Sequence, residues 1–199
     1  MVRLATRAIV RTLAISLVLA FVAGSALALH GRTAPARAQQ VAPSDRSAVV
    51  GAYFTAINNG DVDRAAAVFA GNAVFMGSSL RGNCSQAAPC TDSADIQQQL
   101  TRYVSSHDCR VLRSISVSGA VVTGQAELRS DNIRHNGVDH LMEDFIALVP
   151  AGQITFWANL IDLADPQTAW NHAINLGTAQ PANPPIPNPA TPCTGVSGA

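Results

Sequence analysis

A change of hydrophobic pattern at Cys109 restricts the possible folds of this 199-residue chain more than any other feature. Four segments after it are rich in β-branched and apolar residues, which is typical of strands: 111–118, 121–133, 138–149 and 154–163. Short turn sequences separate them, and one of these, Asn136-Gly137, is the strongest short signal for a β-hairpin. The sequence therefore predicts an antiparallel meander of long strands in the second half of the chain.

Before Cys109 the apolar residues recur at helical spacing. Ser44 can cap a first helix, Asp61 can cap a second short helix, and Ser93 can open a third. A short strand is expected over 73–76. Helices followed by strands point to the α+β class, with two to three N-terminal helices packed on a strongly curved antiparallel sheet. We expect a small cone with an internal pocket.

The first 38 residues have the layout of a secretory signal peptide. Three arginines precede an almost unbroken apolar stretch over 12–29, and the small-residue site Ala36-Arg37-Ala38 follows. A retained membrane anchor is the alternative, since about 18 apolar residues are near the minimum for a membrane span. Both interpretations put the domain outside the cytoplasm. A secreted or extracytoplasmic protein is therefore expected, and it leaves the membrane once the signal is cleaved.

The charge of the chain argues against nucleic acid as a partner. All 13 basic residues are arginine and balance 13 acidic residues, but five of the arginines lie in the first 38 residues. The remainder, an expected domain over 42–178 and a Pro-rich tail over 179–199, is mildly acidic and has no basic stripe that could bind phosphates. No glycine-rich phosphate loop or nucleotide fingerprint is present either, so no cofactor is expected.

Four cysteines in an exported protein predict two disulfides. Three pairings are possible, and we favour Cys84 with Cys90 and Cys109 with Cys193. The first closes a short loop, and the second would tie the tail to the domain. A zinc site is the alternative, but the cysteines are not spaced as paired C-x₂-C knuckles and no histidine pair completes them. No metal is therefore expected.

Two segments carry a family resemblance. Residues 53–69 (YFTAINNGDVDRAAAVF) resemble the opening of SnoaL-like proteins in the nuclear transport factor 2-like (NTF2-like) superfamily, and residues 152–163 (GQITFWANLIDL) are similar to that family's last strand. The resemblance covers roughly residues 45–170 and implies the superfamily's α+β cone. Because this fold hosts isomerases, cyclases, hydrolases, dehydratases and binding modules, it implies no single function.

One subgroup, the limonene-epoxide hydrolase-like members, allows a sharper comparison. In that subgroup one Asp donates a proton to the epoxide, a second Asp takes a proton from water, and an Arg holds both carboxylates. Arg129-Ser130-Asp131 is similar to the Arg-x-Asp of this subgroup, and Trp157 is similar to the Trp of its last strand. Asn159, however, stands where the water-activating Asp would be. An amide cannot serve as a general base. A Tyr that holds the water in the subgroup falls on Phe75.

Hairpin geometry predicts a replacement for the missing base. A two-residue turn at Asn136-Gly137 puts Arg129 opposite Asp144, and the next turn puts Asp144 opposite Asn159, so the three share one face of the sheet. A single β-bulge would put Glu143 in place of Asp144. The predicted catalytic residues are Arg129, Asp131 and Asp144. The residues expected to contact a ligand are Tyr53, Phe75, Met142, Trp157 and Asn159. An ordinary ion-pair cluster on a half-exposed sheet is the alternative.

Two functions of different class follow from this pattern. The first is an exported module that binds a small, largely apolar ligand or a partner chain, and it is favoured because Asn159 removes the base. The second is a small-molecule hydrolase, isomerase or cyclase with Asp131 as acid, Asp144 or Glu143 as base and Arg129 as clamp. Proteins of this fold often pair through the outer face of the sheet, so a homodimer is a reasonable expectation.

Overall fold

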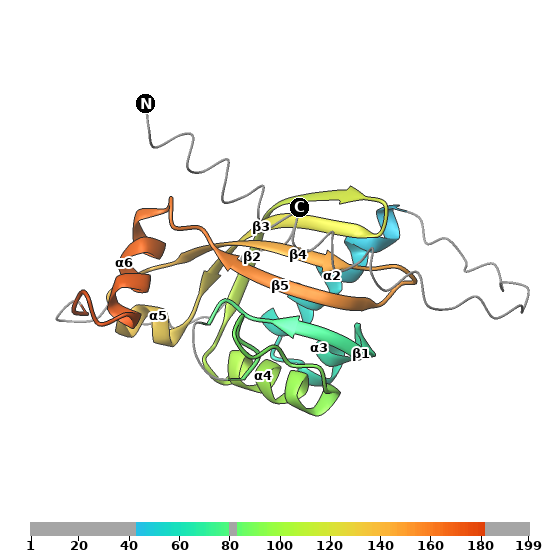
Figure 1. The fold of residues 1–199 in the computed structure, drawn as a ribbon, viewed down its shortest axis with the longest axis horizontal. Coiled ribbons are helices and arrows are strands. Elements are labelled where there is room, and N and C mark those ends of the chain that lie inside the picture. Colours follow the sequence, from blue (N-terminus) through green and yellow to red (C-terminus); the bar gives the residue numbers. More distant parts are fainter. Residues whose placement is uncertain (1–42, 80–82, 182–199) are drawn as a thin grey trace, which may run out of the picture. The chain divides into compact units, whose positions relative to one another are not determined.

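A computed structural model of the chain describes residues 43–79 and 83–181 (Figure 1). The predicted signal peptide at 1–38, the predicted tail from residue 182 onward and Cys193 lie outside the described residues. Within the described ranges, no helix has the length and hydropathy needed to cross a membrane.

Three helices precede the meander, as the sequence predicts: α2 (Pro43–Asn58), α3 (Val62–Ala67) and α4 (Ser93–Ser105). The Asp61 carboxylate caps α3 by accepting a hydrogen bond from the Arg64 N–H at 2.9 Å. The cap of α4 is Asp92, one residue before the predicted position, because its carboxylate accepts from the Ala94 N–H at 2.7 Å. Capping satisfies backbone donors that the first turn of a helix leaves unpaired.

The sheet has five strands: β1 (Phe69–Met76), β2 (Cys109–Ser118), β3 (Val121–Arg129), β4 (Leu141–Leu148) and β5 (Ile154–Ile161). Their spatial order is β1-β5-β4-β3-β2. Strands β2 to β5 form the predicted antiparallel meander, whereas β1 pairs parallel to β5 at one edge. The sheet is curved and remains open, and helix α2 packs against β2 and β3 while α3 and α4 contact β1 (Figure 1).

The predicted strand over 121–133 is interrupted by a short helix, α5 (Asp131–His135). Ser130 caps it, since its hydroxyl oxygen accepts from the Ile133 N–H at 3.3 Å. Asn136-Gly137 ends this helix instead of forming the predicted hairpin turn, and Gly137 has a backbone φ of +75°. A positive φ is required both at a helix C-terminus and in a tight hairpin, so the same dipeptide fits either structure.

The helix changes the strand register, and the predicted register is wrong. Asp144 lies opposite Gln125 on β3, not opposite Arg129. On its other side Asp144 lies opposite Leu160, and Asn159 pairs with Phe145. The pairing of β4 with β5 is therefore shifted by one residue from the predicted pairing. Because side chains alternate between the two faces of a strand, Glu143 and not Asp144 shares the inward face with Asn159.

The core between the helices and the sheet is built from aromatic side chains. Trp157 on β5 stacks on Phe145 of β4, with ring centroids 5.3 Å apart and an interplanar angle of 6°. Tyr53 of α2 meets the Trp157 ring edge-on at 4.8 Å. All three side chains are buried, as is Phe75 of β1. These rings fill the concave side of the sheet below the helices.

A last helix, α6 (Pro166–Asn175), lies with α5 at one end of the sheet (Figure 1). Asp165 caps α6 through the Thr168 N–H at 2.8 Å, and Pro166 is its first residue, as the sequence predicts. The Thr168 hydroxyl also accepts from the Met142 N–H at 2.8 Å, which fixes α6 to the start of β4.

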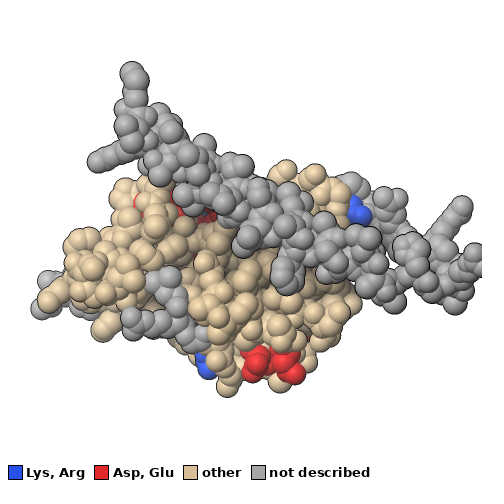
Figure 2. Space-filling model, in the orientation of Figure 1, with Lys and Arg blue, Asp and Glu red and all other residues tan. Residues whose placement is uncertain are grey.

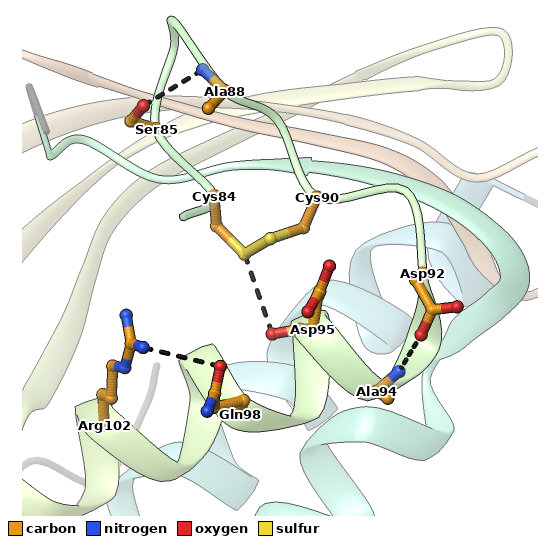
Figure 3. Close-up of a disulfide and its surroundings, with 9 residues drawn as sticks. All are labelled: Cys84, Ser85, Ala88, Cys90, Asp92, Ala94, Asp95, Gln98 and Arg102. Carbon is orange, nitrogen blue, oxygen red and sulfur yellow. Dashed lines mark hydrogen bonds between the residues drawn. A yellow bond between two sulfur atoms is a disulfide. The ribbon is translucent and has the colours of Figure 1, made fainter. Parts of the chain in front are cut away.

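The predicted Cys84–Cys90 disulfide is present (Figure 3). Cys90 and Phe75 exchange backbone hydrogen bonds of 2.8 and 3.0 Å, so the bridged loop is fixed to β1. Figure 3 shows the disulfide over the first turns of α4, where the Cys84 sulfur lies 3.8 Å from the Asp95 carbonyl oxygen. Cys109 is not a free thiol either, and its expected partner lies outside the described residues.

Few charged side chains are visible among the described residues that Figure 2 leaves uncovered. A group of acidic side chains lies along the lower edge of this view, and the few basic side chains that are visible stand apart from one another. This agrees with the low share of charged residues in the chain, 13%.

Candidate active site

Three charged residues are buried on the concave side of the sheet. Arg110 on β2 is 2% exposed, Glu143 on β4 is 1% exposed, and Asp108, which directly precedes β2, is 7% exposed. Strand alternation accounts for two of them: Glu143 is on the same face of β4 as the buried Phe145, and Arg110 pairs with the buried Leu128 of β3. Charged residues are almost never buried to this extent unless they are paired.

The three residues are paired through the Arg110 guanidinium. Its Nη1 donates to Glu143 Oε2 at 2.8 Å, and its Nη2 donates to Asp108 Oδ2 at 3.3 Å. The guanidinium carbon lies 4.5 Å from the centre of the Tyr103 ring, which adds a cation–π contact. The Ser78 hydroxyl donates to the second oxygen of Glu143. Each buried charge therefore has an opposite charge beside it, without which its burial would be strongly unfavourable.

The backbone of Arg110 is held from the helix side. Asn58, the last residue of α2, accepts from the Arg110 N–H and donates to the Arg110 carbonyl oxygen, both at 2.8 Å. The side-chain amide thus forms the pair of hydrogen bonds that a neighbouring strand would make. These two hydrogen bonds fix the position of the Arg110 backbone relative to α2.

Burial dominates the acid–base properties of the site. It raises the pKa of the Asp108 carboxyl, the Arg110 guanidinium opposes this rise, Glu143 adds to it, and the resulting pKa is about 7. Burial also raises the pKa of the Tyr103 hydroxyl to about 12. Burial alone would lower the pKa of Arg110, but Glu143 and the neighbouring groups raise it overall, so the guanidinium stays charged. Asp108 therefore changes its charge near neutral pH.

A cavity of about 470 Å³ opens above this cluster. Asp108, Arg110, Tyr103 and Ser78 line its inner end. Its walls come from α4, α5 and α6, at the end of the sheet where β3 and β5 end and β4 begins. The volume falls in the range of about 300–1,000 Å³ that is usual for small-molecule sites. Glu143 does not line the cavity and lies behind Arg110.

Several buried donors below the cavity have no hydrogen-bond acceptor among the described residues. They include Tyr53 Oη, Arg110 Nε, Trp157 Nε1 and Asn159 Nδ2. The Tyr53 and Trp157 rings are in contact, and Asn159 follows two residues later on the same face of β5. Buried donors of this kind usually bind ordered water, so this layer suits an oxygen acceptor.

Neither a family model nor a curated protein matches the chain. Solved structures do match. An NTF2-like protein of unknown function from Cytophaga hutchinsonii aligns at a TM-score of 0.47 and 13% identity, over 60% of this chain and 91% of that one. An LEH-like epoxide hydrolase of M. tuberculosis aligns at 0.50 and 17% identity, over 68% and 98%. The epoxide hydrolase/cyclase-like enzyme SalBIII, which has a role in pyran ring formation in the polyether salinomycin, aligns at 0.50 and 19%, over 61% and 94%.

The fold is NTF2-like. The α+β prediction and the family resemblance seen in the sequence are confirmed at the level of the fold. At these identities the solved structures establish the NTF2-like fold alone, and any activity has to be argued from the site itself.

The predicted catalytic residues Arg129, Asp131 and Asp144 do not form one cluster in the structure. Asp131 is the first residue of α5, its side chain is 37% exposed, and its Oδ2 lies 2.6 Å from His107 Nδ1. The Arg129 side chain is 40% exposed and donates to Glu127 at 2.7 Å. Asp144 lies next to Gln125, on the face of β4 opposite to Glu143. None of the three lines the cavity.

The residues expected to contact a ligand lie deeper than predicted. Tyr53, Phe75, Trp157 and Asn159 are buried in the core beneath the cavity, and Met142 is half-buried on the other face of β4. None of them lines the cavity. Glu143, the alternative to Asp144, lies on the buried face of β4 opposite Ala126 and Ile161, and not opposite Arg129 and Asn159 as a bulge would have placed it.

The sequence reasoning missed Asp108 and Arg110. They form Asp-x-Arg, the reverse of the expected Arg-x-Asp, at the point where the first long strand begins. The alternation of side chains along β2 could have identified Arg110, because it lies two residues before Leu112 and therefore on the same inward face of the strand. Within the two described ranges, no group of three or more His, Cys, Asp or Glu side chains could hold a metal ion.

Proposed function

We propose that this NTF2-like domain is a small-molecule enzyme of the hydrolase, isomerase or cyclase type, in which Asp108 transfers a proton at the inner end of the cavity. The observation that carries this proposal is that a buried carboxyl with a pKa of about 7 lines a cavity of small-molecule size. General acid–base catalysis is most effective when the pKa of the catalytic group is near the working pH. Strongly shifted pKa values also cluster at functional sites.

Arg110 positions the Asp108 carboxyl group and favours its charged form, which opposes the effect of burial. When Asp108 is protonated, it can donate its proton to a substrate oxygen whose bond to carbon is breaking. The carboxylate that remains is stabilised by the Arg110 guanidinium, 3.3 Å away. It can then take a proton from water or from a substrate carbon, which restores the acid.

Glu143 acts through Arg110 and is a positioning residue. It does not line the cavity, and its two oxygens are engaged by Arg110 and Ser78. Its negative charge balances the guanidinium and keeps the pKa of Asp108 high. Asn159, which cannot be a general base, lies below this layer as one of the buried donors.

The activities of the structural neighbours indicate which reactions should be tested first. Two of these neighbours are described as an epoxide hydrolase and an epoxide hydrolase/cyclase-like enzyme, and those activities belong to these proteins. Opening or closing of an oxygen ring needs a proton at the ring oxygen, which is the step that Asp108 would supply. We place the enzyme outside the cytoplasm, and the Cys84–Cys90 disulfide supports this because disulfides persist mainly in oxidising compartments.

A ligand-binding module is the second candidate. It is favoured by the fact that Asp108 is the one carboxylate that lines the described cavity, whereas ring opening by water generally uses a second group to activate the water. In this case the same cavity would bind the small molecule without changing it.

An assay for turnover separates the two functions. Small epoxides, hydroxy-epoxides and β,γ-unsaturated ketones would be screened as substrates for ring opening, ring closure and isomerisation. Asp108→Asn keeps the shape of the side chain and removes the transferable proton, so we expect a loss of at least about 100-fold in kcat. The rate of the wild-type protein should change with an apparent pKa of about 7.

Asp131→Asn is the matched control for this experiment. It makes the same chemical change at an exposed carboxylate outside the cavity and should leave kcat unchanged. Undiminished turnover in Asp108→Asn would overturn the proposed role. Binding of a probe without turnover in the wild-type protein would favour the binding module.

A further inference from the structure

The walls of the cavity are mostly polar. Twelve of its twenty lining residues carry a neutral amide or hydroxyl side chain. They project mainly from α4, α5 and α6 and from the loop after β1. Small-molecule sites are usually lined mainly by apolar side chains with a few polar groups. A lining of this kind therefore points to a ligand that itself carries many polar groups.

Two of the charged groups that line the cavity, Asp108 and Arg110, are paired with each other. Arg110 is bound by Asp108 and Glu143, and Arg102 Nη2 donates to Gln98 Oε1 at 3.5 Å. A charged ligand would have to compete with these partners. The neutral amides and hydroxyls, in contrast, can bind an uncharged ligand without breaking an ion pair.

A pair of amides between α5 and α6 indicates which polar group fits. Asn136 Nδ2 donates to Asn171 Oδ1 at 2.8 Å, and both residues line the cavity. Asn171 is 7% exposed, and this hydrogen bond uses its Oδ1 and not its Nδ2. The pair leaves one amide donor and one amide acceptor for a ligand. A hydroxyl group matches this combination because it donates and accepts at once.

Another part of the lining is apolar. Leu128, Leu141 and Ile161 come from the ends of three adjacent strands, and Ile133 of α5 adjoins them. A carbohydrate or polyol has the corresponding character, since its C–H groups can pack on apolar side chains while its hydroxyls face the amides.

We infer that the cavity takes an uncharged, hydroxyl-rich molecule the size of a mono- or disaccharide, with hydroxyls directed at the Asn136–Asn171 pair. The inference rests on the proposed function for the location of the site, and it adds the class of substrate. It replaces the largely apolar ligand expected from the sequence.

Binding measurements on the purified, oxidised protein test this inference. Isothermal titration would compare maltose, cellobiose and myo-inositol as neutral hydroxylated probes with glucose 6-phosphate as an anionic probe and limonene oxide as an apolar one. We expect at least one neutral hydroxylated probe to bind more tightly than both of the others. Asn171→Asp keeps the acceptor used by Asn136 and replaces the Nδ2 donor, so affinity for that probe should fall about tenfold.

Matched variants keep the result interpretable. Asn72→Asp makes the same change at an exposed residue of β1 outside the cavity and should leave the affinity unchanged. Asn136→Ala removes the partner amide and serves as a second test if Asn171→Asp does not fold. Turnover of the bound probe by the wild-type protein is measured separately, so binding without turnover marks a failure of the catalytic proposal and not of this one.

Two results would overturn the inference. One is preferential binding of limonene oxide or glucose 6-phosphate, or no binding by any probe. The other is an unchanged affinity in a folded Asn171→Asp variant together with an unchanged affinity in Asn136→Ala.

Discussion

Asp108 and Asp131 illustrate how strongly the environment of a residue decides what it can do. Both are aspartates near the start of an element, and both lie beside a cationic or titratable partner, Arg110 and His107 respectively. Asp131 is exposed to water, whereas Asp108 is buried and its pKa is raised to about 7. Sequence reasoning selected the exposed residue because the local pattern Arg-x-Asp contains no information on burial.

The coupling between Glu143 and Asp108 leads to a prediction at this scale. Because the negative charge of Glu143 raises the pKa of Asp108, Glu143→Gln should lower that pKa. A raised pKa in the folded state means that Asp108 stabilises the fold at low pH, below its unfolded value of 3.8, and that this contribution is lost as pH rises toward about 7. In Glu143→Gln the loss should therefore end at a lower pH.

Urea unfolding at a series of pH values between 4 and 8, together with carboxyl NMR titration of Asp108, measures this shift. Asp144→Asn neutralises the adjacent carboxylate on the other face of β4 and should leave the titration of Asp108 where it was. A pKa of Asp108 that stays the same in Glu143→Gln would contradict the coupling.

At the scale of elements, hydrophobic periodicity predicted the fold well but could not predict the site. The helices, the four-strand meander and the cap of α6 follow from local spacing and capping signals that survive in the structure. The site depends on register, and register depends on how many residues each connection uses. Helix α5 occupies residues that the pattern assigned to a strand and a turn, so Arg129 moves to the end of β3 and faces away from the cavity.

Gly124 provides a test of the packing between neighbouring strands. A Cβ atom at this position would lie 2.1 Å from the Ser114 carbonyl oxygen and 2.5 Å from Cζ of Phe145. Gly124→Ala should therefore force β2, β3 and the Phe145 ring apart and lower the free energy of unfolding by about 1–3 kcal/mol.

Gly71→Ala is the control, because a Cβ at Gly71 of β1 meets no atom within 4 Å. Chemical denaturation of the two variants measures the difference. Equal stability of Gly124→Ala and Gly71→Ala would show that the strands can separate at no cost.

At the scale of the whole molecule, the Cys84–Cys90 disulfide closes the loop before α4, and the backbone hydrogen bonds between Cys90 and Phe75 fix that closed loop to β1. The double variant Cys84→Ser, Cys90→Ser frees this loop in the unfolded chain and should lower the free energy of unfolding by about 2 kcal/mol. Gln86→Ser changes an exposed residue of the same loop and should have no effect of this size. Thermal unfolding of the oxidised proteins compares them, and identical midpoints would contradict a stabilising role.

The amide of Asn58 also affects how the molecule meets other chains. β2 is an edge strand, and the free peptide groups of such a strand can recruit an extended segment from another protein, which leads to aggregation. At Arg110 both peptide groups on the outer side are already occupied by Asn58. Next to the Asp108–Arg110–Glu143 cluster, the edge therefore has no free peptide group at Arg110 for an added strand, so the residue that holds the arginine in place also protects this part of the sheet edge.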